Sequence, residues 1–439
     1  MSVPIGSIVL VGWIPVCAAF FLLFRPVRAL VLSYLVGWLL LPMAKIEIHG
    51  FWDVDKVLAT NAGVILGTLL FHSRQFRGYK VNLADIVLVV FAVGTCATSL
   101  ANGLGAYDGV SSIAKRLFRY AIPFWFGRAF IKDRRDLLEA GRLIVYGAAM
   151  YAVLAVWEWR MSPQIHKTLY GLFQHSFGQH ARWGFYRPVV CFPHALALGT
   201  FFAWTSLVGF SLWRSGHLRP VMGIPAVCFV VLLLVGLLAS MSFGPWGLFG
   251  FGLVLLVCRT RGRWRRLVWV PAICAVLWMA GRYTGLTDGK WMSAAVAQVS
   301  PERAHSLQGR IDSDTLLIER AKERPILGWS TWDRNRVLDE RGRKLAITDG
   351  LWIILLGSFG LVGLSSFYLW WYCPLLLSRR AGPELENEPV IMPLLIAVGL
   401  QAVNFLFNGF LSPVLTLLSG GMVTSMTRMQ RAASVEHMR

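Results

Sequence analysis

Residues 6–24 read GSIVLVGWIPVCAAFFLLF, and the four residues that follow read RPVR. A run of about 20 apolar residues is long enough to cross the hydrocarbon core of a bilayer as a helix. No Lys or Arg precedes this run, whereas Arg25 and Arg28 follow it. Because cytoplasmic loops collect Lys and Arg, the stretch predicts a membrane span whose carboxyl end faces the cytoplasm.

The same pattern continues along the chain and accounts for its unusual composition. Of the 439 residues, 56 % are hydrophobic and only 15 % are charged, whereas soluble domains carry about 25 % charged residues. A water-soluble fold of this composition cannot cover its surface. Counting the apolar runs predicts an all-α polytopic integral membrane protein with about 12–13 transmembrane helices.

Basic clusters indicate how the chain is threaded. The chain has 43 Lys+Arg and 23 Asp+Glu, a net charge of +20. The positive residues stand at every second junction between apolar runs, which is typical of membrane topology rather than of nucleic-acid binding, so we expect a lipid bilayer and no nucleic acid as partner. The clusters, all predicted to be cytoplasmic, are Arg25/Arg28, Arg74/Arg77/Lys80, Lys132/Arg134/Arg135, Arg214/Arg219, Arg259–Arg266, Arg379/Arg380 and Arg428/Arg431.

One long segment breaks the alternation. Residues 287–349 carry mixed charge and are predicted to lie on the outer side, between transmembrane regions at 1–286 and 350–427; a cytoplasmic tail follows at 428–439. Within the segment, Gly309–Pro325 has helix-forming composition and is followed by a Pro-Ile-Leu-Gly turn. Long loops with structure of their own are usually functional. We therefore expect any chemistry on the outer face, beneath this loop.

Two basic sites on the outer side are candidates for anion binding. Arg187 lies at the mouth of the seventh apolar run, where a guanidinium could hold phosphate oxygens in a bidentate manner or simply snorkel to the interface. Lys115, Arg116 and Arg119 form a second group near the start of the fifth apolar run, residues 110–130. Cations in a membrane-embedded bundle often mark substrate pathways, although pairing with Asp108 or with lipid phosphates is an equal alternative.

Three residues of the long loop are further candidates. Arg310 opens the predicted loop helix, and the simplest interpretation is a surface ion pair with Asp314, one turn later. Asp349 is the last polar residue before the eleventh apolar run, residues 351–377, so it is either a helix cap or a general base. Trp329 could stack on a sugar ring or belong to the interfacial aromatic belt.

The sequence predicts neither a metal nor a cofactor. The outer histidines lack metal-ligand spacing, and the seven cysteines lie inside or at the edge of apolar runs, where they are typical small hydrophobic residues.

Several short motifs bear a family resemblance. The chain resembles the O-antigen ligase and Wzy-type polymerase superfamily in an Arg that opens a loop helix, a Pro-Ile-Leu-Gly turn and a span with the pattern Leu-x-x-x-Gly-x-x-Gly. The residues that carry the resemblance are GR at 309–310, RPILGW at 324–329, DGLWI at 349–353, LGSFGLVG at 356–363 and RPVVCFPHALA at 187–197.

The resemblance implies a function that the residue pattern alone does not. Members are GT-C-like glycosyltransferases of the bacterial inner membrane that transfer a glycan from undecaprenyl pyrophosphate to an acceptor hydroxyl on the periplasmic face, without a metal. The family arginines correspond to Arg187 and Arg310, which would hold the pyrophosphate. The catalytic His of lipid A-core ligases falls at Asp349, a departure that favours a polymerase, for which a chain-length regulator is a further partner.

Three alternatives stay open at this stage. A ligase would pass a finished glycan to lipid A-core or to another acceptor. A polysaccharide transporter would form no bond, but transporters usually place their charged residues near the bilayer midplane, and the candidates here stand near the outer boundary. A non-catalytic assembly subunit follows if Asp349 does not replace the histidine.

Overall fold

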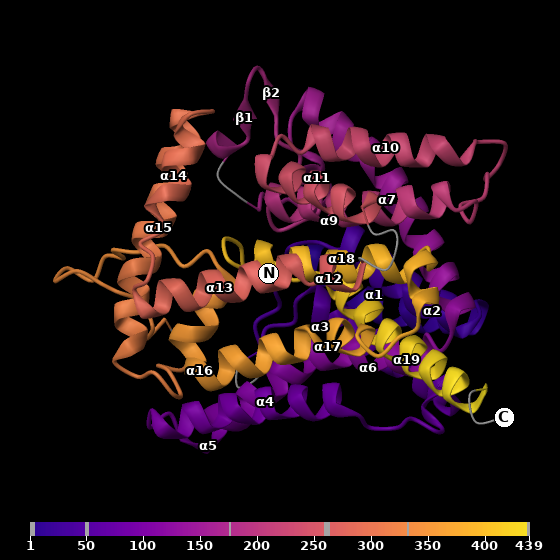
Figure 1. Cartoon of the computed structure of the whole chain (residues 1–439), viewed down its shortest axis with the longest axis horizontal. Coiled ribbons are helices and arrows are strands. Elements are labelled where there is room, and N and C mark those ends of the chain that lie inside the picture. The colour runs from indigo at the N-terminus through magenta and orange to yellow at the C-terminus, as the bar shows by residue number, and fades with distance from the viewer. Residues whose placement is uncertain (1–4, 49–51, 175–176, 259–263, 332, 437–439) are drawn as a thin grey trace.

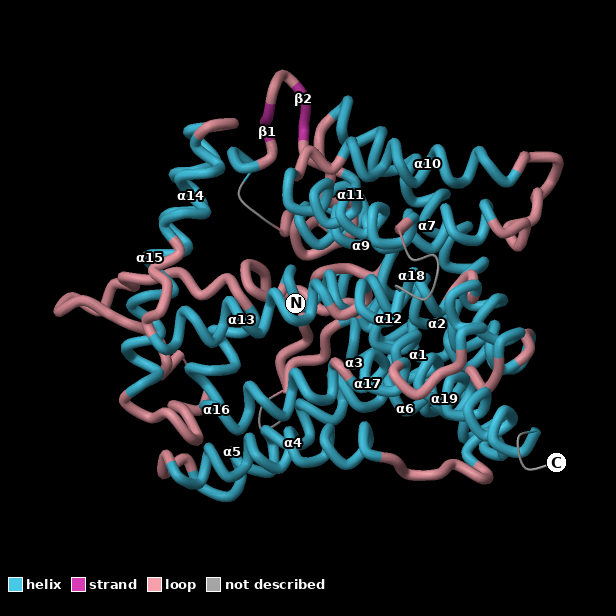
Figure 2. The backbone as a smooth tube through the Cα atoms, in the orientation of Figure 1, coloured by secondary structure: helices cyan, strands magenta, loops and turns pink. Residues whose placement is uncertain are grey.

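The computed structural model describes residues 5–48, 52–174, 177–258, 264–331 and 333–436, and most of them are helical (Figures 1 and 2). Five helices are long and apolar enough to cross a membrane: α1 (Ile5–Leu23), α4 (Leu83–Ala101), α7 (Arg134–Met161), α9 (Ala195–Arg214) and α16 (Leu351–Trp371). Shorter apolar helices are α2 (Pro26–Leu40), α10 (Ala226–Ala239), α11 (Phe243–Val257) and α18 (Ile391–Asn404). The helical membrane protein is therefore confirmed, while the count of 12–13 spans stays a prediction.

The remaining elements complete the bundle and cover one of its ends. The longer ones are α3 (Lys56–Gly67), α5 (Gly105–Arg116), α6 (Ile122–Phe130), α13 (Val270–Thr284), α15 (Pro301–Lys322) and α19 (Pro413–Glu436). The short ones are α8 (Ile165–Tyr170), α12 (Trp264–Leu267), α14 (Lys290–Ala297), α17 (Cys373–Ser378), β1 (Ala181–Arg182), β2 (Phe185–Tyr186), η1 (Thr68–His72), η2 (Ser73–Phe76), η3 (Leu117–Ala121), η4 (Phe177–Gln179) and η5 (Pro383–Asn387).

Several apolar runs do not form single helices, and two of them bear on the site. Residues 110–130 are divided among α5, the π-helical turn η3 and α6. The seventh run, 189–213, becomes helical only at Ala195, because the preceding residues form a loop and the His194 imidazole accepts the Leu196 N–H at the start of α9. Hydrophobicity predicts burial in both places, but it does not predict where the backbone leaves the helical conformation.

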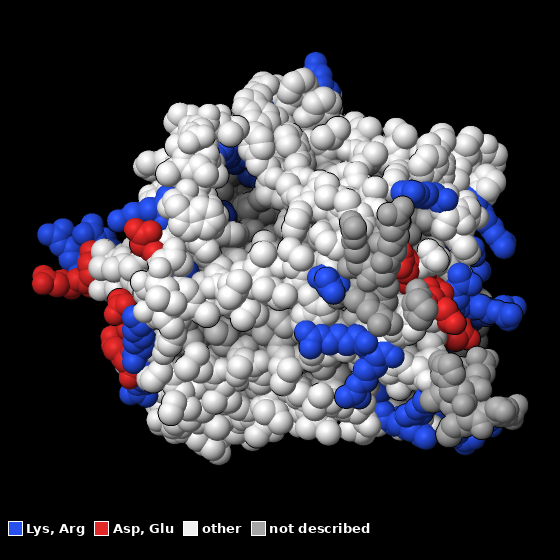
Figure 3. Space-filling view, in the orientation of Figure 1, with Lys and Arg blue, Asp and Glu red and all other residues white. Residues whose placement is uncertain are grey.

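Charged side chains gather at two ends of the molecule, with a broad uncharged surface between them (Figure 3). The end that carries α14 and α15, called here the α14–α15 end, shows both signs of charge, whereas the opposite end is mainly basic and is called the basic end (Figures 1 and 3). An uncharged belt between charged ends is the surface expected of a helical bundle in a bilayer.

Five of the seven basic loops lie next to one another at one end of the bundle. Four contacts join them: Arg28 with Glu139 at 2.8 Å, Arg134 with Glu388 at 2.8 Å, Lys132 with Gln75 at 2.7 Å, and Arg142 with the His217 carbonyl at 2.6 Å. Of the predicted Arg259–Arg266 cluster, residues 259–263 lie outside the described residues.

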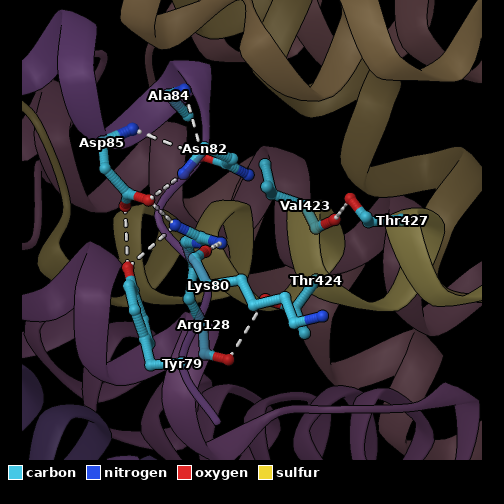
Figure 4. Close-up of polar contacts among 9 residues, drawn as sticks. All are labelled: Tyr79, Lys80, Asn82, Ala84, Asp85, Arg128, Val423, Thr424 and Thr427. Atoms are coloured by element: carbon cyan, nitrogen blue, oxygen red, sulfur yellow. Dashed lines mark hydrogen bonds and ion pairs between the residues drawn. The ribbon is translucent and has the colours of Figure 1, made fainter.

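A buried ion pair ties α4 to α6 near the basic end (Figure 4). The Arg128 guanidinium pairs with the Asp85 carboxylate and donates to the Tyr79 hydroxyl at 2.8 Å. Tyr79 in turn donates to Asp85 at 2.7 Å, and Thr424 of α19 donates to the Arg128 carbonyl oxygen at 3.1 Å. Because both charges are buried and each has several partners, the cluster joins three helices without leaving an unpaired charge.

The break in α16 joins the long loop to the bundle. Gly360 has φ 62° and ψ −164°, a conformation that is essentially restricted to glycine. Residues 325–330 lie against this break: the N–H groups of Leu361 and Val362 donate to the carbonyls of Pro325 and Ile326 at 2.8 and 3.2 Å. The Trp329 N–H donates in the other direction, to the Gly357 carbonyl at 2.9 Å. The predicted turn at 325–328 is therefore confirmed. Its backbone hydrogen bonds to both sides of the break in α16 are called here the α16 clamp.

The predicted loop helix is present with an earlier start. It begins at Pro301 rather than at Gly309 and ends at Lys322. Pro301 occupies the first turn, where its missing N–H costs no hydrogen bond.

Substitution of Gly360 tests the clamp. An alanine Cβ at this position would lie 2.2 Å from the Ile326 carbonyl oxygen in addition to requiring φ 62°. Gly360→Ala should therefore destabilise the protein by about 2 kcal/mol or more, seen as a lower thermal midpoint in detergent. Gly250→Ala is the control, because its Cβ would meet no atom within 4 Å. Equal midpoints for the two variants would contradict the clamp.

A labelling experiment tests the threading. Ser306 of α15 and Ser215, beside the basic residue Arg214, are both exposed and lie in segments predicted to be on opposite sides of the membrane. In a background without native cysteines, a membrane-impermeant thiol reagent should label Ser306→Cys in intact cells and leave Ser215→Cys unlabelled. The reverse result would place the α14–α15 end in the cytoplasm.

Candidate anion-binding and catalytic site

Arg187 stands directly after a small hairpin at the α14–α15 end. Strands β1 and β2 pair in antiparallel register through a turn at Trp183 and Gly184, whose φ values are 49° and 77°. Two successive positive φ angles are typical of the tight turns that match strand twist. Beyond the strands, the Arg187 N–H donates to the His180 carbonyl at 2.7 Å, and His180 Nδ1 lies 3.0 Å from the Arg187 carbonyl oxygen. The hairpin thus determines where the Arg187 backbone lies.

The Arg187 side chain is buried and incompletely paired. It is 5 % exposed; one terminal nitrogen donates to Ser242 Oγ at 2.7 Å, whereas its Nε has no partner among the described residues. Burial, together with the nearby positive charges of Arg182, Arg303 and Arg310, lowers the pKa of the guanidinium to about 9. Cations that crowd together in this way favour an anion among them.

The turn before α11 is the place where these arginines meet. Arg182 donates to the Met241 carbonyl at 3.2 Å, and the Arg303 guanidinium lies 5.7 Å from the centre of the Phe243 ring. With the Arg187–Ser242 contact, two arginines of the hairpin and one of α15 reach residues 241–243. The surface between the β1–β2 hairpin and α13 is hollowed, and basic side chains show at its rim (Figure 3). The positive end of the α11 dipole adds to the same field.

Arg310 and Asp349 form an ion pair across the loop. Arg310 Nε lies 3.3 Å from Asp349 Oδ2, and the side chains are 33 % and 39 % exposed. The interpretation of Arg310 as the surface partner of Asp314 is therefore wrong: the partner comes from the start of α16, 39 residues along the chain. The structure does not show Asp349 as a helix cap either, since Gly350 occupies that position without a side-chain cap.

Arg282 of α13 fixes α15 against the bundle. Its guanidinium donates to the Ile311 carbonyl and to Thr315 Oγ1, both at 2.8 Å, and also contacts the Asp288 carbonyl. Since Ile311 follows Arg310 directly, this contact determines how far Arg310 lies from the membrane helices.

Asp314 is a buried carboxyl group that belongs to the same cluster. It is 5 % exposed, and its pKa is raised to about 7, mainly by burial. The negative charge of Asp349 acts in the same direction, and the positive charges of Arg282 and Arg310 oppose it. A buried carboxyl group with a raised pKa beside an ion pair is a common feature of sites for acid–base chemistry.

Trp329 is already engaged within the protein. The guanidinium carbons of Arg320 and Arg324 lie 3.5 and 4.4 Å from the ring centre, and the indole N–H donates to the Arg320 carbonyl at 2.8 Å. This packing is a strong cation–π arrangement. Stacking of Trp329 on a sugar stays a prediction, and the structure shows a role in holding the turn after α15.

The second basic group lies elsewhere in the bundle. Lys115 and Arg116 end α5, and Arg119 follows in η3. The Arg116 guanidinium lies 4.8 Å from the centre of the Phe359 ring of α16. In Figure 1, α5 lies on the opposite side of the molecule from the β1–β2 hairpin, so the structure does not bring this group to Arg187. A substrate-binding role for these three residues stays a prediction.

Sequence reasoning missed Arg182, Arg303 and Asp314. Arg303 could have been found, because it stands seven residues before Arg310 and two helical turns place both on one face of a helix. Asp314 was set aside because a carboxylate four residues from an arginine is usually a surface partner. Among the described residues, no group of three or more His, Cys, Asp or Glu side chains is arranged to hold a metal ion.

The fold and site together define a helical membrane protein with a cationic, partly buried site beside two carboxyl groups at one end of the bundle. No protein-family model matches the chain, and no curated protein matches it.

The raised pKa of Asp314 predicts a pH effect on stability. The folded protein holds a proton on Asp314 up to about pH 7, whereas the unfolded chain releases it near pH 4. Between these values the folded state binds more protons, so stability falls as pH rises. The thermal midpoint of the wild type should drop between pH 5 and pH 8 relative to that of Asp314→Asn.

The exposed neighbour Asp312 provides the control for this measurement. Asp312→Asn should retain the pH dependence of the wild type. Parallel curves for the wild type and Asp314→Asn would show that Asp314 is ionised in the folded protein over the whole range.

Proposed function

We propose that the protein is a membrane glycosyltransferase that takes a glycan from undecaprenyl pyrophosphate and extends a polysaccharide, as a Wzy-type polymerase does. The observation that carries the proposal is the meeting of Arg187 with Arg182, Arg303 and Arg310 beside Asp349. The four arginines outnumber the carboxylates of Asp349 and Glu302 beside them, so the site carries a net positive charge that a diphosphate would neutralise.

In this proposal the arginines stabilise the diphosphate leaving group. As the bond between the anomeric carbon and the diphosphate oxygen breaks, the oxygen takes the bonding electrons and its negative charge grows. Arg187, with an Nε that has no partner in the described structure, and Arg310, which is partly exposed, would donate hydrogen bonds to that charge. Donors positioned in advance in a partly buried site stabilise such a charge more than water does.

Asp349 activates the acceptor hydroxyl as a general base in this proposal. An acceptor hydroxyl that attacks the anomeric carbon must lose its proton, and the Asp349 carboxylate would take it. Arg310 lies between the two functions, because it contacts Asp349 and adds to the charge around Arg187. Direct displacement of the diphosphate inverts the anomeric configuration. No step requires a metal ion or a nucleotide sugar.

The proposal also includes a location and partners. The α14–α15 end would face the periplasm of a bacterial inner membrane, where the lipid-linked donor and the growing glycan acceptor are found. A chain-length regulator is a further partner of such polymerases. A ligase that transfers the finished glycan to lipid A-core or another acceptor would use the same site.

Reconstitution tests the activity. Purified protein incubated with undecaprenyl-pyrophosphate-linked repeat unit in the presence of EDTA should produce a ladder of longer glycans. Transfer only to an added lipid A-core acceptor would show the ligase instead. Absence of any transfer with either acceptor, by a folded protein, would contradict the proposed function.

Conservative substitutions separate the two roles. Arg187→Lys and Arg310→Lys keep the charge and lose the planar fork, so each should reduce turnover by roughly 10²-fold. Asp349→Asn should reduce turnover while donor binding changes little, because the amide cannot take the proton. Arg219→Lys at the basic end is the control and should retain wild-type rates. Near-normal turnover of Asp349→Asn would mean that another group is the base.

A further inference from the structure

The loop between β2 and α9 has a strained backbone directly after Arg187. Val190 has φ 49°, a left-handed conformation that is rare for a β-branched residue. Its neighbours Val189 and Cys191 are 2 % and 1 % exposed, so the strain lies in the interior and not in a free surface turn. Strained residues of this kind persist only where the surroundings hold them.

Glu158 holds one side of this loop. It stands near the end of α7 and is 1 % exposed. One carboxylate oxygen accepts the N–H groups of Val189 and Val190, both at 2.8 Å, and the other accepts the N–H of Ile165 at 3.0 Å. The charged acceptor therefore binds two successive backbone amides at the strained residue, an interaction stronger than one between neutral groups.

Lys56 holds the other side. It begins α3 and is 4 % exposed; its ammonium donates to the Cys191 carbonyl at 2.8 Å and to the Trp38 carbonyl at 3.0 Å. Tyr151 accepts the Cys191 N–H at 2.9 Å, and Gln174 donates to the Val190 carbonyl at 2.6 Å. Four side chains thus bind the backbone of residues 189–191: Glu158 and Tyr151 of α7, Lys56 of α3, and Gln174 of the loop after α8.

Buried charges in a membrane protein are costly and usually have a function. Here the Glu158 carboxylate and the Lys56 ammonium both bind the backbone of one short loop, residues 189–191. Arg187 stands two residues before this loop. We propose that Glu158 and Lys56 are positioning residues that hold residues 189–191 in the strained conformation and thereby keep the Arg187 guanidinium at the start of α11. The identity of the anion that Arg187 binds there rests on the proposed function. The proposal that Glu158 and Lys56 hold the loop is independent of it.

Thiol labelling tests the holding of the loop. Cys191 is buried in the loop itself, so its reactivity reports local opening. In full-length protein in detergent with the other six cysteines replaced, Cys191 should react slowly with a maleimide. Glu158→Gln keeps the shape and removes the charge, and it should speed labelling about tenfold; Glu158→Ala should speed it more.

A matched control separates this effect from a general loss of stability. Glu388 is also a buried carboxylate, but it pairs with Arg134 at the basic end. Glu388→Gln should leave the labelling rate of Cys191 unchanged. Equal rates for the wild type and for a folded Glu158→Gln variant would overturn the proposal, even if Glu158→Ala fails to fold.

A double-mutant cycle tests whether the loop acts through Arg187. Binding of inorganic pyrophosphate to the purified protein should weaken about tenfold in Glu158→Gln. In an Arg187→Lys background the same change should weaken binding by less than about twofold, because the two residues act through one contact. Additive losses would show that Glu158 is merely structural and would overturn the positioning role. If the wild type binds no pyrophosphate, the proposed function loses its anion site, and the labelling of Cys191 still decides whether the loop is held.

Discussion

Backbone hydrogen bonding across the break in α16 is the interaction on which the rest of the site depends. Within a membrane, a broken helix is tolerated only where other protein groups pair with the freed N–H and C=O groups. Residues 325–330 provide those groups on both sides of Gly360. The end of α15 and the start of α16 are consequently fixed relative to each other, and this geometry brings Arg310 within 3.3 Å of Asp349.

Buried charges have two different uses in this bundle. Near the basic end, Asp85 and Arg128 pair with each other and join helices (Figure 4). Toward the α14–α15 end, Glu158 and Lys56 bind backbone groups of a loop, and Arg187 keeps a nitrogen without a partner in the described structure. A self-contained pair stabilises the fold, whereas a cation that has hydrogen-bonding capacity left over is suited to an anion from outside.

The candidate site was predicted from the sequence only in part. Arg187 was recognised because a cation at an outer span boundary contradicts the charge rule, and Arg310 and Asp349 because of the motifs around them. The arrangement of these residues in space was not predicted, because the pairing of Arg310 with Asp349 depends on how the loop returns to the bundle. In the sequence, Arg182 and Asp314 look like ordinary polar residues. Arg182 belongs to the site because it lies near Arg187, and Asp314 because it lies near Arg282.

The sequence by itself determined that this is a helical membrane protein and that a helix and a turn lie in the long loop. These properties follow from local composition, because hydrophobicity and charge act on each segment separately. Tertiary structure decided where apolar runs leave the helical conformation, as at Gly360 and before Ala195, and which charges meet. Those outcomes depend on backbone groups finding partners far along the chain, and no local pattern specifies such partners.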